Sequence, residues 1–335
     1  MLNPSAVESV CRVSAALARS DALVIDGDTH ITDVARLPEP WRQKYAEDPH
    51  YYHGRPNSAE DLIGEMDLCG VDMALCWQDP ASTFYGDDCD GNAEALLAAN
   101  RYVFEAARRY PDRILPAGWT DPKACGVANA IRIAEICVCE FGFFVVKMNP
   151  AQNGYPIDSP AVAAVVERIV ELGAVPAFHF GADSPYTPAS GLERLLDNHP
   201  GHPFLGVHMG GGGASYEGGE SLAHEARELG LRRLQLRYIL SSKRDTHMER
   251  DILTYQKAGL PFSENLFCGS DAPYGRVAWN FGGFRAMLRT LEVRYPDHFG
   301  SAATANLLGR NLARFALEGL RNLLHTHGIP ETACR

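Results

Sequence analysis

Asp28 and His30 are the first residues of this chain whose types and spacing could do chemistry. They follow the apolar run 22–25, Ala-Leu-Val-Ile, which predicts a short buried strand. Side chains two apart on a strand point to the same side, so the carboxylate and the imidazole would converge on one ion at the strand's end. Asp-x-His is common by chance, and the pair alone is weak evidence.

Three later apolar runs also end in a residue that could bind a metal: His179, His208 and Asp271. Borderline divalent ions accept imidazole nitrogen and carboxylate oxygen together. Two carboxylates would balance the charge of such an ion and leave a coordination position open for water or a substrate oxygen. Five residues of this kind on four strand ends predict a real site rather than structurally satisfied polar residues.

The elements that would position these residues are strands alternating with helices. Eight short apolar runs predict buried strands at 23–28, 71–77, 114–119, 141–148, 174–180, 203–209, 236–241 and 265–270. Helical patterning predicts helices at 59–69, 92–110, 126–139, 159–172, 190–198, 221–234 and 246–259. Uninterrupted hydrophobicity is typical of strands covered on both faces, and eight strand–helix units in about 300 residues indicate an α/β fold, the (β/α)8 TIM barrel. Periodicity alone leaves a doubly wound open sheet as the alternative.

We expect residues 1–335 to form a single barrel domain, because no Pro/Gly/Ser-rich linker and no change of composition divides the chain. Residues 1–22 predict an N-terminal helix, and residues 320–335 predict a C-terminal tail that is an arm or disordered. The long interval 32–58 between the first two strands is either an excursion over the barrel mouth or a loop packed against the barrel's side.

The composition excludes several classes of function. The net charge of -11 argues against binding to nucleic acid or to anionic membranes. No apolar run approaches the ~20 residues that span a bilayer. Nine cysteines, an odd number, indicate reduced thiols in a cytoplasmic protein rather than a disulfide scaffold. The expected partner is therefore a small-molecule substrate.

Five segments carry a resemblance to a known family: Val24–His30, Val146–Pro150, Phe178–Gly181, Val207–Gly211 and Cys268–Pro273. Their order and approximate spacing resemble the amidohydrolase-2 family, whose members include aminocarboxymuconate-semialdehyde decarboxylase and decarboxylases of the γ-resorcylate type. The resemblance implies a metal-dependent enzyme of the amidohydrolase superfamily, with a (β/α)8 barrel and one divalent ion. It also implies a homodimer, since dimers are common among the relatives.

The resemblance assigns roles to the residues at the strand ends. It implies that the metal ligands are Asp28, His30, His179 and Asp271. It implies that His208 is an acid/base or substrate-polarising group and that Asp271 also takes part in catalysis. Many members have histidine where this chain has Asp28, while several aromatic-acid decarboxylases have a carboxylate there. The extra negative charge makes the ion a weaker Lewis acid, so Mn²⁺ becomes the alternative to Zn²⁺, which is our first expectation.

Four further residues are predicted to bind substrate. Trp77, Phe180 and Tyr274 lie just after strand ends and would stack on a planar substrate, and Arg244 would clamp a substrate carboxylate. Each has a structural alternative, which is rim packing for the aromatic residues and an exposed charge at a helix start for the arginine. Lys147 ends the fourth run, and we expect a packed lysine rather than a modified one that bridges two metals.

The resemblance favours a lyase, namely a metal-dependent non-oxidative decarboxylase of a small aromatic or unsaturated carboxylic acid. The same ligands would serve a hydrolase acting on a lactone, ester or amide, or a hydratase. A binding or structural barrel with a vestigial site is a third hypothesis, and the intact set of ligand-type residues argues against it.

Overall fold

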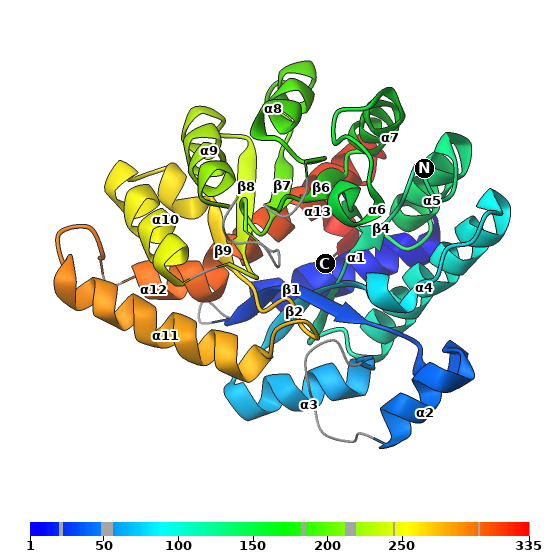
Figure 1. Ribbon diagram of the computed structural model, residues 1–335, viewed down its shortest axis with the longest axis horizontal. Helices are drawn as coiled ribbons and strands as arrows, with labels where there is room; N and C mark the ends of the chain where they lie inside the picture. The colour runs from blue at the N-terminus through cyan, green and yellow to red at the C-terminus, as the bar shows by residue number, and fades with distance from the viewer. Residues whose placement is uncertain are drawn as a thin grey trace.

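The computed structural model of the protein describes residues 1–19, 23–47, 56–181, 185–211, 219–243, 245–300 and 302–334. Its centre is a set of parallel strands that alternate with helices along the chain (Figure 1). The strands are β1 (Ile25–Ile31), β2 (Met73–Gln78), β3 (Ile114–Pro116), β4 (Gly118–Trp119), β5 (Val145–Met148), β6 (Val175–His179), β7 (Phe204–Val207), β8 (Leu236–Leu240) and β9 (Leu266–Cys268).

Backbone hydrogen bonds arrange these strands in a ring. One sheet has the order β1-β2-β3 and the other the order β4-β5-β6-β7-β8-β9. Ala117 lies between β3 and β4 and donates its N–H to Cys76 of β2, so β3 and β4 occupy one strand position. Pro116 has no N–H to donate, which interrupts the ladder there. A parallel bridge between Thr29 and Ala272 joins β1 to the segment after β9. The fold is the predicted (β/α)8 TIM barrel.

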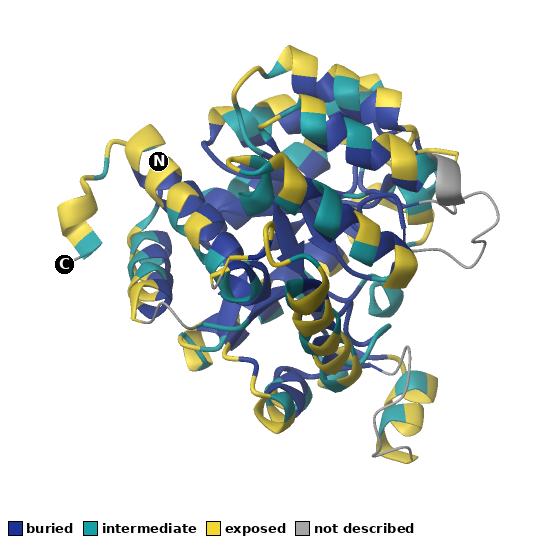
Figure 2. Cartoon of the chain, turned by 90° about the vertical axis from the view of Figure 1, so that its left-hand side faces the viewer, coloured by how far each residue is buried: buried dark blue, intermediate teal, exposed yellow. Residues whose placement is uncertain are grey.

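Helices surround the strands (Figures 1 and 2). Those of one turn or more are α1 (Pro4–Ala18), α2 (Glu39–Glu47), α3 (Ala59–Cys69), α4 (Cys89–Arg109), α5 (Val127–Cys139), α6 (Pro150–Asn153), α7 (Pro160–Glu171), α8 (Ala189–Asn198), α9 (Gly219–Arg232), α10 (Asp245–Ala258), α11 (Val277–Arg294) and α13 (Asn311–Thr326). Short turns are η1 (Val34–Arg36), η2 (Pro80–Ser82), η3 (Phe262–Glu264), α12 (Ala303–Ala305), η4 (Asn306–Arg310) and η5 (Glu331–Cys334). Helix α7 buries one apolar stripe formed by Val162, Val165 and Ile169, as an amphipathic helix packed on a barrel does.

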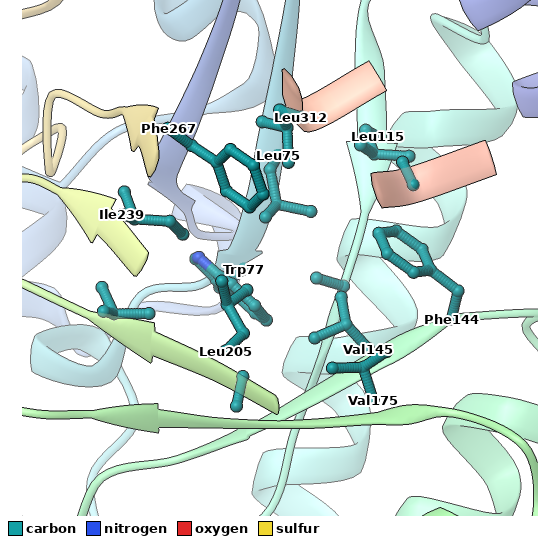
Figure 3. Close-up of a cluster of buried hydrophobic side chains, with 14 of the residues drawn as sticks. Leu75, Trp77, Leu115, Phe144, Val145, Val175, Leu205, Ile239, Phe267 and Leu312 are labelled. Atoms are coloured by element: carbon teal, nitrogen blue, oxygen red, sulfur yellow. The ribbon is translucent and has the colours of Figure 1, made fainter. Parts of the chain in front are cut away.

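Apolar side chains from different strands fill the interior. Figure 3 shows a buried cluster that includes Leu75, Leu205 and Ile239, all of them inaccessible to solvent. A filled interior leaves the carboxyl ends of the strands as the place where polar residues can meet a ligand.

Some element boundaries differ from the prediction. The predicted strand 141–148 begins only at Val145, because Gly142 has a left-handed backbone with φ of 75°. Gly142 also approaches α1 so closely that a Cβ atom on this residue would lie 2.6 Å from the carbonyl oxygen of Ala6. The first strand runs on to Ile31, so Asp28 and His30 lie within it. Helices α11 and α13 go beyond the predicted set.

The C-terminal segment corrects the prediction of a tail at 320–335. Helix α13 continues to Thr326, and Leu320, Leu323 and Leu324 are buried. Leucines at this spacing form an apolar helix face, and folding against the barrel removes that face from water.

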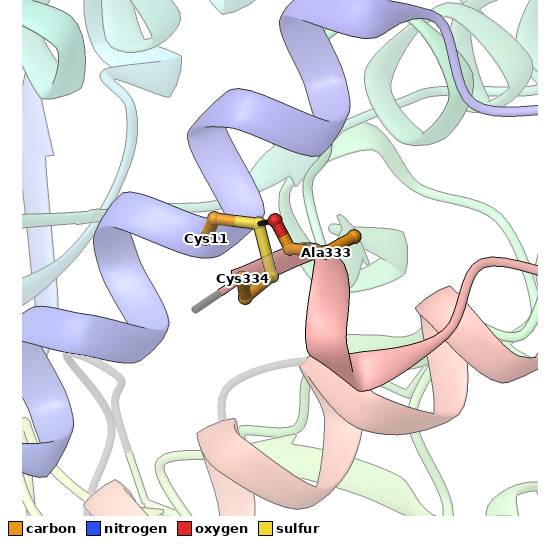
Figure 4. Close-up of a disulfide and its surroundings, with 3 residues drawn as sticks. All are labelled: Cys11, Ala333 and Cys334. Carbon is orange, nitrogen blue, oxygen red and sulfur yellow. Dashed lines mark hydrogen bonds between the residues drawn. A yellow bond between two sulfur atoms is a disulfide. The ribbon is translucent and has the colours of Figure 1, made fainter.

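A disulfide joins Cys11 of α1 to Cys334 of η5, 323 residues away in the sequence (Figure 4). It corrects the expectation of reduced thiols, because these two cysteines are paired while the other seven are free. No local pattern indicates the pair, since only the fold brings the two ends of the chain together.

The interval 32–58 contains η1 and α2, neither of which has a buried residue. Residues 48–55 of this interval lie outside the described part of the chain. Trp41 of α2 packs on Phe84, which follows β2, with ring centres 5.9 Å apart. This contact ties α2 to the β2–α4 connection. Along the described residues, no helix is both long and apolar enough to cross a membrane.

Candidate functional site

Three side chains that could hold a metal ion converge where β1 and β9 end. Asp28 and His30 lie on β1, and Asp271 comes shortly after β9. One ligand atom of each lies within 4.8 Å of the other two. The His30 Nε2 atom is 3.6 Å from the Oδ1 atom of both carboxylates. The barrel brings the ends of the two strands together, and the Asp271 N–H donates to the Asp28 carbonyl at 2.8 Å.

Asp28 is completely buried and is held by three donors. Its Oδ1 atom lies 3.1 Å from the indole Nε1 of Trp77 and 3.4 Å from the Nζ atom of Lys147. Its Oδ2 atom accepts from the Ser241 hydroxyl at 2.7 Å. Burial alone would raise the pKa of this carboxyl, but the charge of Lys147 and the hydrogen bond from Ser241 hold the pKa below its usual value. Asp28 is therefore a fixed, ionised carboxylate.

Lys147 is a buried cation that sits between two aromatic rings. Its Nζ atom lies 5.0 Å from the ring centre of Trp77 and 4.9 Å from that of Trp119. Aromatic faces attract an ammonium group, and the pair with Asp28 compensates the lysine's charge. A carboxylated lysine would instead place a second negative charge against Asp28 and the two faces. The contacts therefore fit an unmodified lysine.

A backbone carbonyl fixes the orientation of His30. The Nδ1 atom lies 2.9 Å from the carbonyl oxygen of Gln78 at the end of β2. A carbonyl only accepts, so Nδ1 carries a proton and Nε2 is the ring atom left to bind a metal. Nε2 faces Asp28 and Asp271. A partner on the second ring nitrogen is the usual way in which a metal-binding imidazole is oriented.

His179 and His208 form a pair beside this group. The Nε2 atom of His208 lies 3.1 Å from the Nδ1 atom of His179, and its Nδ1 atom lies 2.8 Å from the Ser241 hydroxyl. Burial lowers the pKa of His208, and burial together with His208 lowers that of His179 well below its usual value. Both rings are therefore neutral. His179, a predicted metal ligand, lies outside the group of three formed by Asp28, His30 and Asp271.

Four described residues other than glycine have a left-handed backbone, and all follow β7, β8 or β9. They are His208 (φ 77°), Met209 (φ 47°), Ser242 (φ 45°) and Asp271 (φ 59°). This conformation costs about 1–2 kcal/mol for each residue with a Cβ atom. Such strain persists where the surroundings impose it, and it clusters at functional sites. Because Ser242 is left-handed, consecutive hydroxyls reach both acids: Ser241 donates to Asp28, and Ser242 donates to Asp271.

The predicted substrate-binding residues have different surroundings. Trp77 and Phe180 are fully buried and offer no exposed surface; Trp77 orients Asp28, and Phe180 stacks on Tyr238 with ring centres 6.3 Å apart. Tyr274 is half-buried and contacts the His30 ring edge-on at 5.7 Å. Its hydroxyl donates to Asp79 at 2.5 Å. Arg244 lies outside the described residues.

Ser241, Ser242 and the carbonyl of Gln78 are functional groups of the site that the sequence did not predict. A signal was present, because Ser241 and Ser242 directly follow the apolar run of β8. Hydroxyls at the carboxyl end of a barrel strand can reach the site as readily as ligands do. The Gln78 carbonyl carried no signal, since any residue type provides one.

Asp26 lies two residues before Asp28 and has the opposite electrostatic environment. It is fully buried, its Oδ1 atom accepts from the backbone N–H groups of Asp28 (3.2 Å) and Ser270 (2.8 Å), and its Oδ2 atom has no partner among the described residues. Burial without a cation raises the pKa of Asp26 to about 7. Two carboxyls only two residues apart on β1 therefore differ, one being ionised and the other easily protonated.

Comparison with known proteins places this geometry in context. The model of the family described as Amidohydrolase matches residues 25–236. No curated protein sequence matches the chain.

Several solved structures share the fold at low sequence identity. One is the 5-carboxyvanillate decarboxylase of Sphingomonas paucimobilis, with 18% identity, 88% of this chain and 98% of that chain covered, and a TM-score of 0.64. A second is a dihydroxybenzoic acid decarboxylase of Polaromonas sp. JS666 with bound manganese and 2-nitroresorcinol. It has 14% identity and a TM-score of 0.61, and the match covers 88% of this chain and 96% of that chain. The 4-oxalomesaconate hydratase of Rhodopseudomonas palustris has 16% identity and a TM-score of 0.56, and the match covers 91% of this chain and 99% of that chain.

Proposed function

The chain belongs to the amidohydrolase family, and from that premise we propose that it is a metal-dependent, non-oxidative decarboxylase of a small aromatic or unsaturated carboxylic acid. The observation that carries the proposal is the convergence of Asp28, His30 and Asp271 at the carboxyl ends of the strands, where barrel enzymes do their chemistry. Similarity to two aromatic-acid decarboxylases supports it.

The donor set suits one divalent ion. Asp28 is ionised in one orientation, and His30 presents a lone pair between the two carboxylates. His179 lies outside the group of three, and we propose that it completes the set as the fourth ligand. Zn²⁺ is the first candidate; two carboxylates also suit the harder Mn²⁺, and manganese is bound in the Polaromonas decarboxylase. When bound, the ion supplies Lewis acidity toward the substrate's carboxylate and the oxygen next to it.

Side chains of the protein then transfer the proton. For a hydroxylated benzoate, Asp271 removes the proton of the neighbouring hydroxyl and returns it to the ring carbon that bears the carboxylate. The bond from that carbon to the carboxylate breaks, its electron pair restores the aromatic ring, and carbon dioxide leaves. The substrate oxygen regains a proton from water. His208 is neutral and orients the His179 ring, and Tyr274 packs beside His30 at the edge of the site.

Hydration is the second candidate, because the structure of a hydratase has the same fold. In that reaction, or in hydrolysis, Asp271 accepts a proton from the attacking water. The two classes differ in the fate of the carboxylate and of solvent oxygen.

The experiment incubates protein reconstituted with Mn²⁺ or Zn²⁺ in oxygen-18 water with a panel of hydroxylated benzoic and enoic acids. We expect carbon dioxide and a product that lacks solvent oxygen. Solvent oxygen in the product without carbon dioxide would favour the hydratase or a hydrolase, and no release from any acid would overturn the proposal. Metal-free protein with chelator is the control.

Two further predictions concern the whole protein. We propose a homodimer, which light scattering in solution would test. We also propose a cytoplasmic location on the basis of the seven free cysteines, although the Cys11–Cys334 disulfide is unusual for that compartment. Thiol titration of protein purified from cytoplasm under alkylating conditions gives the redox state of that pair.

A further inference from the structure

We propose that Ser241 sets the proton positions on His208 and His179, and so leaves the Nε2 atom of His179 with the lone pair that a metal requires. The inference rests on the proposed function in one respect, namely that His179 is a metal ligand. Ser241 acts through other residues, which makes it a positioning residue.

The chain of hydrogen bonds starts at Asp28. The Ser241 hydroxyl lies between two partners, 2.7 Å from the Asp28 Oδ2 atom and 2.8 Å from the His208 Nδ1 atom. A hydroxyl has one proton, and a carboxylate paired with Lys147 only accepts. Ser241 therefore donates to Asp28 and must accept from His208.

A second acceptor requires the same arrangement on His208. The carbonyl oxygen of Ser241 lies 3.3 Å from the same Nδ1 atom, and a carbonyl cannot donate. Both nearby groups of Ser241 thus place the proton of the neutral ring on Nδ1. The Nε2 atom of His208 is left with a lone pair.

The assignment passes from His208 to His179. The His208 Nε2 atom lies 3.1 Å from the His179 Nδ1 atom, and the two rings meet edge-on with centres 4.4 Å apart. Since Nε2 of His208 accepts, Nδ1 of His179 must donate, and the lone pair of His179 is on Nε2. His30 receives the same assignment directly from the Gln78 carbonyl. The buried charge of Asp28 thus determines the tautomer of a ligand on β6 through two intermediates.

The first test reads the tautomers directly in metal-free protein. Histidine labelled with nitrogen-15 gives different frequencies for a protonated and a lone-pair ring nitrogen, and correlation spectra at slightly alkaline pH assign both atoms of each ring. We expect protonated Nδ1 in His30, His208 and His179. A lone pair on Nδ1 of His208 or of His179 would overturn the inference.

The second test removes the hydroxyl. Ser241→Ala should give mixed tautomers at His208 and His179 and weaken Mn²⁺ binding about 10-fold, as the loss of a partner behind a metal ligand does. Ser241→Thr keeps the hydroxyl and should restore both readouts. Ser270→Ala is the matched control, because its buried hydroxyl lies at the end of β9 near the Asp28 carbonyl and contacts neither ring.

If Ser241→Ala keeps the tautomers and the affinity of the unmodified protein, the hydroxyl has no such role. If the variant does not fold, the spectrum of the unmodified protein alone decides. Expected tautomers in a protein that releases no carbon dioxide would reject the proposed function and leave this inference standing. Decarboxylation with the opposite tautomers would do the reverse.

Discussion

The two sides of the candidate site are built differently. On the β1–β5 side, defined as Asp28, His30, Trp77 and Lys147, every residue lies within a strand and is almost fully buried. On the β7–β9 side, defined as His208, Ser241, Ser242 and Asp271, every residue comes after a strand has ended. All but Ser241 have a left-handed backbone, and Asp271 keeps 8% of its surface exposed.

This difference separates two tasks. Strand backbone surrounded by a packed core holds the Asp28–Lys147 charge pair in one place, where solvent cannot screen it. The residues after β7, β8 and β9 carry backbone strain, and Ser242 and Asp271 keep some exposed surface, which suits groups that exchange protons with a substrate. We therefore expect changes on the β1–β5 side to affect stability most and changes on the β7–β9 side to affect metal binding and turnover.

The largest expected effect is that of Lys147→Met. Removing the ammonium leaves Asp28 buried without a counter-charge, which costs about 3–5 kcal/mol in the free energy of unfolding. Denaturant titration of metal-free protein measures it. Arg132→Met breaks the exposed pair with Glu94 and should cost less than about 1 kcal/mol. Equal costs for the two variants would contradict the role given to the buried pair.

Asp26→Asn tests whether a cation is what distinguishes Asp28 from its neighbour. The pKa of Asp26 is raised to about 7 in the fold, so its contribution to stability is full below the unfolded value near 4 and is lost as the pH rises toward 7. Each unit of that shift corresponds to roughly 1.4 kcal/mol.

In metal-free protein the Asn variant should therefore gain stability relative to the unmodified chain between about pH 4 and pH 7. Urea titrations at several pH values measure the difference. A difference that does not change with pH would show that Asp26 is ionised in the fold.

Asp271→Asn should affect metal binding more than stability. It removes a charged ligand atom from the edge of the site, so we expect Mn²⁺ affinity to fall at least about 100-fold. The free energy of unfolding of the metal-free protein should change by less than about 1 kcal/mol, since asparagine has nearly the same shape and keeps an oxygen that accepts from Ser242. Calorimetric titration and denaturant unfolding of the same sample give both numbers. Full affinity in this variant would remove Asp271 from the ligand set.

Two replacements of Ser242 distinguish the effect of its strained backbone from the effect of its hydrogen bond to Asp271. Ser242→Ala and Ser242→Gly both remove the donor to Asp271 and should weaken Mn²⁺ binding about 10-fold. Only glycine relieves the left-handed backbone, so the Gly variant should be more stable than the Ala variant by about 1 kcal/mol. Thermal melts compare the two. An Ala variant as stable as the Gly variant would mean that the backbone there is not strained.

The sequence predicted the barrel because buried parallel strands are continuous apolar runs, and those runs survive as β1 to β9. It also predicted Asp28, His30, His179 and Asp271 as metal ligands from their side-chain types near strand ends, and three of the four converge, while His179 lies outside that group. It missed Ser241 and Ser242, because the reach of a hydroxyl depends on backbone conformation rather than on residue type.

Other features could be recognised only in the tertiary structure. Trp77 looked like a surface for substrate, yet its N–H donates to Asp28 from inside the core. The Cys11–Cys334 pair depends on the two ends of the chain meeting. Contacts between residues far apart in sequence produce no periodic pattern in the sequence.

The most direct test of the account titrates metal-free protein with Mn²⁺ while bound metal and carbon dioxide release from a hydroxylated benzoic acid are measured together. The account predicts that release rises in proportion to bound metal, levels off at one equivalent, and stops when chelator is added. Binding of less than roughly 0.2 equivalents, together with carbon dioxide release that chelator does not reduce, would contradict it.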